Sequence, residues 1–195
     1  MQSISPTRYN VLLASNSPRR RELLHMIVPN FGIAQAANVE EAYPSNLAPE
    51  KVPEYLSQIK AKPYASLINQ NELIITADTV VINDGKILGK PKDFDDAAEM
   101  LKALRNKTHT VVTGVTLTTI DSLETFSCST DVTFGDISDV EIELYINEFR
   151  PFDKAGAYGI QEWIGCIGIQ GINGCFYNVM GLPLYSLYQR LKKYA

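Results

Sequence analysis

The chain has 195 residues, a formal net charge of −4 at pH 7 and a hydrophobic fraction of 45%. This acidic balance argues against broad nucleic-acid binding, which needs a basic surface, and the ordinary composition excludes a disordered, fibrous or membrane-spanning chain. The three cysteines (128, 166 and 175) form no close-spaced pair, so we expect a reduced, cytoplasmic protein without a membrane segment.

The first half of the chain alternates between predicted strands and helices. A buried strand is expected over residues 9–15 and a helix over 18–27, which Ser17 caps and Pro18 begins. A second helix over 48–68 should kink or end at Pro63, because proline removes a backbone donor. A strand over 72–83 then runs into Asn-Asp-Gly at 83–85, a sequence typical of a hairpin turn.

The second half continues the alternation. We predict a helix over 93–107, strands over 109–120 and 124–134, and a helix to about Phe149 that the capping box Ser138–Glu141 opens. A glycine-rich stretch, 155–175, leads to a last strand and a closing helix over 182–194. Helices interleaved with strands predict an α/β fold, and the antiparallel hairpin makes its sheet mixed.

The stretch "ASNSPRRREL" (14–23) is the first candidate site. A strand, a short loop and a helix N-terminus direct free N–H groups and the positive end of the helix dipole to one place, which suits an anion. Ser15, Ser17, Arg19 and Arg20 would add hydroxyl and guanidinium donors for phosphate oxygens. The alternative is a capped surface helix with solvated arginines. The loop lacks the lysine and glycines of a P-loop.

Asp78 is the second candidate, since its carboxylate interrupts the apolar strand "IITADTVVI". A buried charge is costly unless it is paired or bound to a metal, and such a carboxylate is a candidate catalytic base. The alternative is that Asp78 caps a turn or pairs with an arginine.

Three further candidates are weaker when each is taken alone. Lys90 stands between a glycine and a proline in "LGKPKD", and Lys60 lies in "QIKAK", but lysines are usually solvated. In "DKAGAYGIQ" (153–161), small residues would let a ligand approach the backbone, and Gln161 offers a donor and an acceptor to a base edge. The alternative for this last segment is a tight loop. A second "GIQ" at 168–170 lacks the preceding "KAGAY" and is expected to be strand or turn.

Taken together, "SNSPRR", "ADTVV", "GKP", "DKAGAYGIQ" and "GLPL" (181–184), in this order, resemble the Maf family of nucleoside triphosphate pyrophosphatases. The resemblance covers about residues 9–192, so we expect a single Maf-like domain over 1–195. It implies an elongated, mixed, twisted sheet flanked by helices, with a cleft between two lobes, a fold similar to that of inosine triphosphatases. It also implies a homodimer.

The resemblance also implies an activity: cleavage of nucleoside triphosphates to the monophosphate and pyrophosphate with a divalent cation, Mg²⁺ or alternatively Mn²⁺. The nucleotide would be the partner, with neither nucleic acid nor membrane involved. Asp78 matches the family's catalytic aspartate, either as the base that activates water or as a metal ligand, and Glu41 matches an acidic position that helps bind metal. The positions that match phosphate-binding residues are Ser15, Arg19, Arg20, Lys60 and Lys90.

Base specificity is implied by three positions. Arg19, Thr79 and Gln161 match the subgroup that hydrolyses dTTP and UTP, in a role of cleaning the nucleotide pool. The 7-methyl-GTP subgroup typically has tryptophan at the first position and glutamate at the third. This chain departs from the family after Gln161, where Glu162-Trp163 replaces the usual glycine.

Two other functions compete with this reading. One is a nucleotide-binding regulator of septum formation without turnover, against which the combination of Asp78, Lys60 and Lys90 argues. The other is a nucleic-acid-binding module, against which the acidic balance argues.

Overall fold

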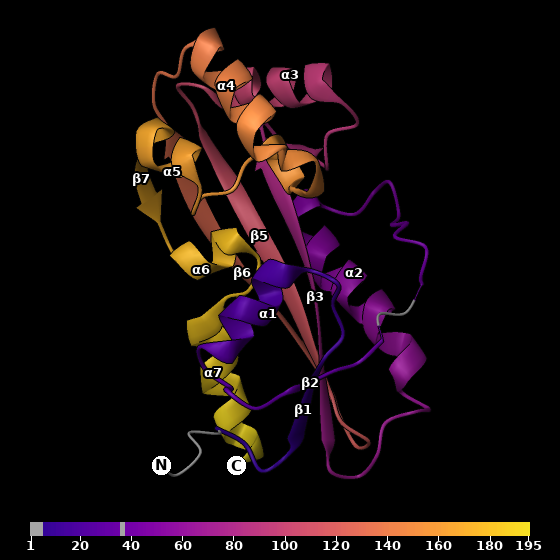
Figure 1. Cartoon of the computed structure of the whole chain (residues 1–195). Coiled ribbons are helices and arrows are strands. Elements are labelled where there is room, and N and C mark those ends of the chain that lie inside the picture. The colour runs from indigo at the N-terminus through magenta and orange to yellow at the C-terminus, as the bar shows by residue number, and fades with distance from the viewer. Residues whose placement is uncertain (1–5, 36–37) are drawn as a thin grey trace. The chain divides into compact units, whose positions relative to one another are not determined.

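The computed structural model describes residues 6–35 and 38–195, which form two compact units (Figure 1). Unit 1 comprises Met1–Asp78, Thr113–Cys128 and Gly181–Ala195, and unit 2 comprises Thr79–Val112 and Ser129–Met180. The chain therefore passes between the units four times.

In the described part of the chain, seven strands form one mixed sheet, and helices flank it. The strands are β1 (Asn10–Leu13), β2 (Gly32–Ile33), β3 (Glu72–Asn83), β4 (Lys86–Leu88), β5 (Thr108–Thr118), β6 (Leu123–Phe134) and β7 (Ile169–Asn173). Their order is β2-β1-β3-β5-β6-β7, with β4 paired to β3. β1 pairs in parallel with β2 and β3, whereas the β3–β4 and β6–β7 pairs are antiparallel. The predicted α/β fold with a mixed sheet is confirmed.

The helices are mostly short. They are α1 (Pro18–His25), α2 (Val52–Ala61), α3 (Phe94–Leu104), α4 (Asp139–Phe149), α5 (Trp163–Gly168), α6 (Phe176–Met180) and α7 (Leu184–Leu191), with 3₁₀ turns at Pro49–Lys51, Lys62–Tyr64, Pro151–Asp153, Ala155–Ala157 and Lys192–Tyr194. Within residues 6–35 and 38–195, none of them has the length and apolar character needed to cross a membrane.

The predicted helix caps form as expected. Ser17 Oγ accepts a hydrogen bond from the backbone N–H of Arg20, and Pro18 is the first residue of α1. At α4, Ser138 Oγ accepts from the N–H of Glu141, whose carboxylate accepts from the N–H of Ser138 at 2.7 Å. Both helices therefore begin where the sequence predicts.

The predicted chain breaks are also confirmed. Pro63 ends α2, because it lies in the 3₁₀ turn that follows Ala61. At the β3–β4 hairpin, Asp84 and Gly85 have φ angles of 49° and 74°, the left-handed pair that the Asn-Asp-Gly sequence predicts.

The glycine-rich stretch contains more structure than its composition suggests. It contains the short helix α5 and the last strand, β7, which was expected to follow the stretch. The residues after the stretch form the short helix α6 instead, so the expected position of the last strand is wrong. The second "GIQ" spans the end of α5 at Gly168 and the start of β7 at Ile169, in keeping with the expected strand or turn. The closing helix is shorter than predicted, since α7 covers only Leu184–Leu191 before a 3₁₀ turn.

In unit 1, the two ends of the described chain are joined. Thr7 Oγ1 and the backbone N–H of Arg8 both donate to the carbonyl oxygen of Tyr194, at 2.9 and 3.2 Å. The Tyr9 and Tyr194 rings meet edge to face with centroids 5.9 Å apart. The start of β1 is thereby fixed to the 3₁₀ turn that follows α7.

In unit 2, α3 packs against α4 (Figure 1). Their buried side chains share a core with β6, to which Leu101, Leu104, Phe134, Ile142 and Tyr145 contribute. Tyr145 is fully buried. This core gives α4 a fixed place from which the Tyr145 hydroxyl reaches the 153–162 segment.

Candidate active site

The loop between β1 and α1 carries the predicted anion site. Ser15 is buried, and its Oγ accepts from the N–H of Ser17 at 3.2 Å. The first turn of α1 contains no acidic residue, so no carboxylate there offsets the positive end of the helix dipole. Arg19 lies half-buried on this turn. The loop therefore keeps the chemistry that suits an anion.

Arg20 joins α1 to two other segments of unit 1. Its Nη1 donates to the carbonyl oxygen of Ala77 and its Nε to that of Gly181, both at 2.9 Å. Ala77 directly precedes Asp78 in β3, and Gly181 begins the "GLPL" motif. Arg20 thus brings three motifs of the sequence together by contacts with the backbone.

Lys60, in the last turn of α2, pairs with two carboxylates. Its Nζ lies 2.6 Å from Asp78 Oδ1 and 3.0 Å from Glu41 Oε1. The Asp78 side chain is 11% exposed and that of Glu41 is 57% exposed, so the inner carboxylate is the strongly desolvated one. The alternative that Asp78 pairs with an arginine does not describe this ion pair, because its partner is Lys60, while Arg20 acts on Asp78 as a nearby charge.

The charges around Asp78 oppose one another. Burial raises the pKa of the Asp78 carboxyl, while the cations of Lys60 and Arg20 lower it and Glu41 raises it slightly. Burial lowers the pKa of the Arg20 guanidinium, and Asp78 opposes that effect. An arginine stays protonated in any case, so Asp78 has fixed cationic neighbours.

Glu41 and Asp78 are the acidic side chains of unit 1 that come closest to forming a metal site. Across 6–35 and 38–195, no group of three or more histidine, cysteine or acidic side chains gathers to hold an ion. Glu41 and Asp78 provide a pair of carboxylates that share one cationic partner. A pair of carboxylates suits a divalent cation such as Mg²⁺, which rarely takes a full protein cage.

The other predicted site residues, Thr79, Lys90 and Gln161, belong to unit 2. Lys90 and Gln161 are exposed, and Thr79 is half-buried in β3. The N–H of Gly156 donates to the carbonyl oxygen of Gly89 at 3.0 Å, so the "GKP" and "KAGAYG" motifs adjoin within this unit.

The sequence analysis missed a polar network that includes Glu162, the residue directly after Gln161. Lys154 is 7% exposed and pairs with Glu162, and Glu162 in turn accepts from the Tyr145 hydroxyl. A signal was available in the sequence, because an apolar, glycine-rich segment is bounded by a cation at 154 and an anion at 162.

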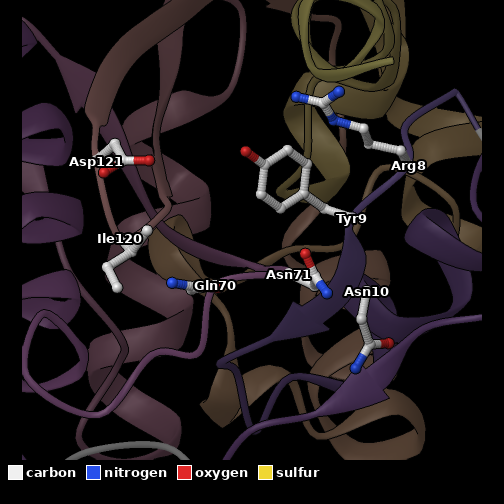
Figure 2. A pocket seen from close by; sticks show the side chains of 7 residues that line it. All are labelled: Arg8, Tyr9, Asn10, Gln70, Asn71, Ile120 and Asp121. Atoms are coloured by element: carbon white, nitrogen blue, oxygen red, sulfur yellow. The ribbon is translucent and has the colours of Figure 1, made fainter.

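A pocket of about 650 Å³ lies elsewhere in unit 1 (Figure 2). It is lined by Arg8, Tyr9, Asn10, Gln70, Asn71, Ile120 and Asp121. Asn10 and Glu72 are partners at the amino ends of the parallel strands β1 and β3, whereas Ser15 follows the carboxyl end of β1. This pocket therefore contains none of the predicted site residues.

No disulfide links Cys128, Cys166 and Cys175, all of which lie in the described part of the chain.

Known sequences match this chain over nearly its whole length. A model of the family described as Maf-like protein matches residues 10–194. A dTTP/UTP pyrophosphatase of Phocaeicola vulgatus is 50% identical over 186 residues, 95% of this chain and 96% of that protein. One from Porphyromonas gingivalis is 51% identical over 190 residues, 96% of each. A solved nucleoside-triphosphatase (dITP/XTP pyrophosphatase) from Mycobacterium abscessus has a TM-score of 0.41 at 14% identity, covering 65% of this chain and 75% of that one.

Proposed function

Since this chain belongs to the Maf family, we propose that it hydrolyses dTTP and UTP to the monophosphate and pyrophosphate, and so removes these nucleotides from the pool. Two relatives of about half-identical sequence, named dTTP/UTP pyrophosphatases, support the substrate assignment. The observation that carries the proposal is the placement of Asp78, a buried carboxylate beside Lys60 and Arg20.

The triphosphate would bind the cationic side of the unit 1 cluster. This cluster contains three cations (Arg19, Arg20 and Lys60) and two carboxylates (Asp78 and Glu41). Its net charge is therefore positive, which favours binding of an anion at the start of α1. Ser15 would add a hydroxyl donor. Such fixed charges stabilise the leaving pyrophosphate as negative charge develops on it.

The chemical step would be attack of water on the α-phosphorus. The new P–O bond forms as the bond to the bridging oxygen of the β-phosphate breaks, and pyrophosphate leaves with those electrons. In the base role, the ionised Asp78 carboxylate accepts the proton of the attacking water. In the alternative role, Asp78 is a metal ligand, and the proton passes to solvent.

Glu41 and Asp78 would hold the divalent cation, Mg²⁺ or alternatively Mn²⁺. When bound, the cation would neutralise charge on the phosphates and orient them. Lys60 Nζ bridges the same two carboxylates in this structure. When the cation binds them, Lys60 would form an ion pair with the phosphates in place of one of these carboxylates.

The remaining site assignments rest on the resemblance. Lys90 would bind phosphate, and Arg19, Thr79 and Gln161 would select the base, where the Gln161 amide can pair with the carbonyl and imide of a pyrimidine. A homodimer acting in the cytoplasm is proposed on the same ground, and sedimentation of the purified protein tests the dimer.

A nucleotide panel tests the proposal. The wild-type protein is incubated with Mg²⁺ and each of dTTP, UTP, dCTP, dATP, GTP and 7-methyl-GTP, and pyrophosphate and orthophosphate are measured separately. We expect pyrophosphate, with dTTP and UTP turned over fastest. A nucleoside diphosphate as first product would contradict the assignment, and tight binding without any release would favour the regulator of septum formation.

A further inference from the structure

Gln161 is exposed, but a single hydroxyl binds the backbone of Gly159 before it and the side-chain carboxylate of Glu162 after it. The N–H of Gly159 donates to Tyr145 Oη at 3.0 Å, and the Tyr145 hydroxyl donates to Glu162 Oε2. One buried tyrosine of α4 therefore holds the residue two places before Gln161 and the residue directly after it.

The second carboxylate oxygen of Glu162 is also occupied. Lys154 Nζ lies 3.1 Å from Glu162 Oε1 and 2.9 Å from Asp153 Oδ1, and the Lys154 side chain is only 9% exposed. An unpaired buried charge is strongly unfavourable, so Lys154 and Glu162 resist separation.

The turn that carries Gln161 leaves little room for another conformation. The N–H of Glu162 donates to the Gly159 carbonyl at 3.0 Å, and the Glu162 carbonyl accepts from Gly165 at 2.9 Å as α5 begins. A Cβ added at Gly159 would lie 2.7 Å from the Glu162 carboxylate carbon, and one at Gly165 would lie 1.8 Å from the Ile160 carbonyl oxygen. Both glycines are thus required for the close approach.

We propose that Tyr145, Glu162 and Lys154 are positioning residues for base selection, because they hold the 159–163 turn so that Gln161 meets the base in one orientation. This inference rests on the proposed function, in which Gln161 contacts the base. A fixed amide discriminates between bases better than a mobile one, since a mobile amide can turn to suit a purine as well as a pyrimidine.

The test compares two conservative variants, Tyr145→Phe and Glu162→Gln, with the wild type. Tyr145→Phe removes the shared hydroxyl and keeps the buried ring, while Glu162→Gln keeps an acceptor but loses the charge that pairs with Lys154. Dissociation constants are measured for αβ-imido analogues of dTTP and dGTP, which are not cleaved. In each variant we expect the preference for the thymine analogue to fall about 5- to 20-fold, chiefly through weaker dTTP-analogue binding.

Amide hydrogen exchange at Gly159 and Glu162 supplies a readout that does not depend on nucleotide. Exchange at both amides should accelerate in Tyr145→Phe. The double variant should lose no more base preference than the more affected single variant, because both changes release the same turn.

Tyr158→Phe is the matched control for loss of a buried hydroxyl in unit 2. Its hydroxyl contacts His109 Nε2 at 2.7 Å, not the Gln161 turn. We expect this variant to melt at a lower temperature than the wild type but to keep its base preference.

Base preference unchanged in both Tyr145→Phe and Glu162→Gln would overturn the inference, as would an equal loss of affinity for both analogues. A failure of the proposed function would give a different result: the wild-type protein would bind the analogues but release no pyrophosphate from dTTP. In that case the ratio of the dissociation constants for the dGTP and dTTP analogues, compared between variants and wild type, still tests whether Tyr145 and Glu162 position Gln161. A wild type with no preference between the analogues would also overturn it.

Discussion

Burial raises the pKa of the Asp78 carboxyl, and the cations of Lys60 and Arg20 lower it. A substitution at Asp78 should therefore have a large effect on the reaction. Asp78→Asn should lower the rate of pyrophosphate release from dTTP about 10²–10⁴-fold, because an amide neither accepts a proton nor binds Mg²⁺ as well. The measurement is kcat with a thermal melt to confirm folding. Near-wild-type turnover in a folded variant would make Asp78 structural.

Asp121→Asn is the matched control, since Asp121 is exposed at the β5–β6 turn beside the pocket of Figure 2. It should keep the wild-type rate. The two roles of Asp78 can be separated by Mn²⁺ titration, because only the ligand role predicts weaker ion binding in Asp78→Asn.

Gln161 carries the specificity prediction. Gln161→Glu replaces an amide that donates and accepts with a carboxylate that only accepts, so a pyrimidine carbonyl would lose its donor. We expect kcat/KM for dTTP and UTP to fall roughly 10- to 100-fold, with 7-methyl-GTP less affected.

The second "GIQ" provides an internal control for that change. Gln170→Glu makes the same substitution at an exposed position of β7 and should leave the base preference as it was. If Gln161→Glu behaves like Gln170→Glu, Gln161 does not read the base.

At the scale of elements, α2 depends on a glycine of β5 for its place in unit 1. A Cβ added at Gly114 would lie 2.3 Å from the backbone of Pro53, so Gly114→Ala must push α2 away from the strand. We expect the free energy of unfolding in urea to fall by about 1–3 kcal/mol. Because α2 also carries Lys60, the rate of pyrophosphate release should fall as well.

Gly171→Ala is the control for this element, since nothing lies within 4 Å of a Cβ added there in β7. It should be close to neutral in both measurements. Wild-type stability in Gly114→Ala would show that α2 can shift at little cost.

Elements with a strong local signal could be predicted from the sequence. Pro18, Pro63, the Asn-Asp-Gly turn and the Ser138 capping box each act through the backbone of a few neighbouring residues. The helices α5 and α6 could not be predicted, because they have five or six residues each and short helices depend on tertiary contacts rather than on propensity.

The candidate site divides in a similar way. The sequence motifs identified Ser15, Arg20 and Asp78 as site residues. The ion-pair partners of Lys60 could not be predicted, because Glu41 and Asp78 are 19 and 18 residues away from it in the sequence. Among the anchors of the Gln161 turn, the charges of Lys154 and Glu162 were visible in the sequence, but Tyr145 was not, because it meets Glu162 only after α4 packs.

For the whole molecule, stability should depend on pH through His109. Its ring is 2% exposed, and burial lowers the pKa of His109 to about 4. Between that value and about 6.5, the unfolded chain binds a proton that the folded protein does not. The free energy of unfolding should therefore decrease as the pH falls from 6.5 to 4, by at most about 3 kcal/mol from this residue.

Urea unfolding at pH 7 and pH 4.5 measures this effect in wild type and in His109→Gln, which can still bond to Tyr158. The variant should lose less stability between the two pH values. His25→Gln, a change to the exposed second histidine, should behave like the wild type, and equal pH dependence in all three proteins would contradict the role of His109.

The junction of Thr7 and Arg8 with Tyr194 has a consequence for how the protein is made. All residues of unit 2 have been synthesised once Met180 is added, but unit 1 still lacks its last segment, Gly181–Ala195. At about 5–20 residues per second, synthesis from Thr7 to Tyr194 takes on the order of 10–40 s. Thr7 and Arg8 must therefore wait for Tyr194 for nearly that whole period, and unit 2 can complete its contacts first.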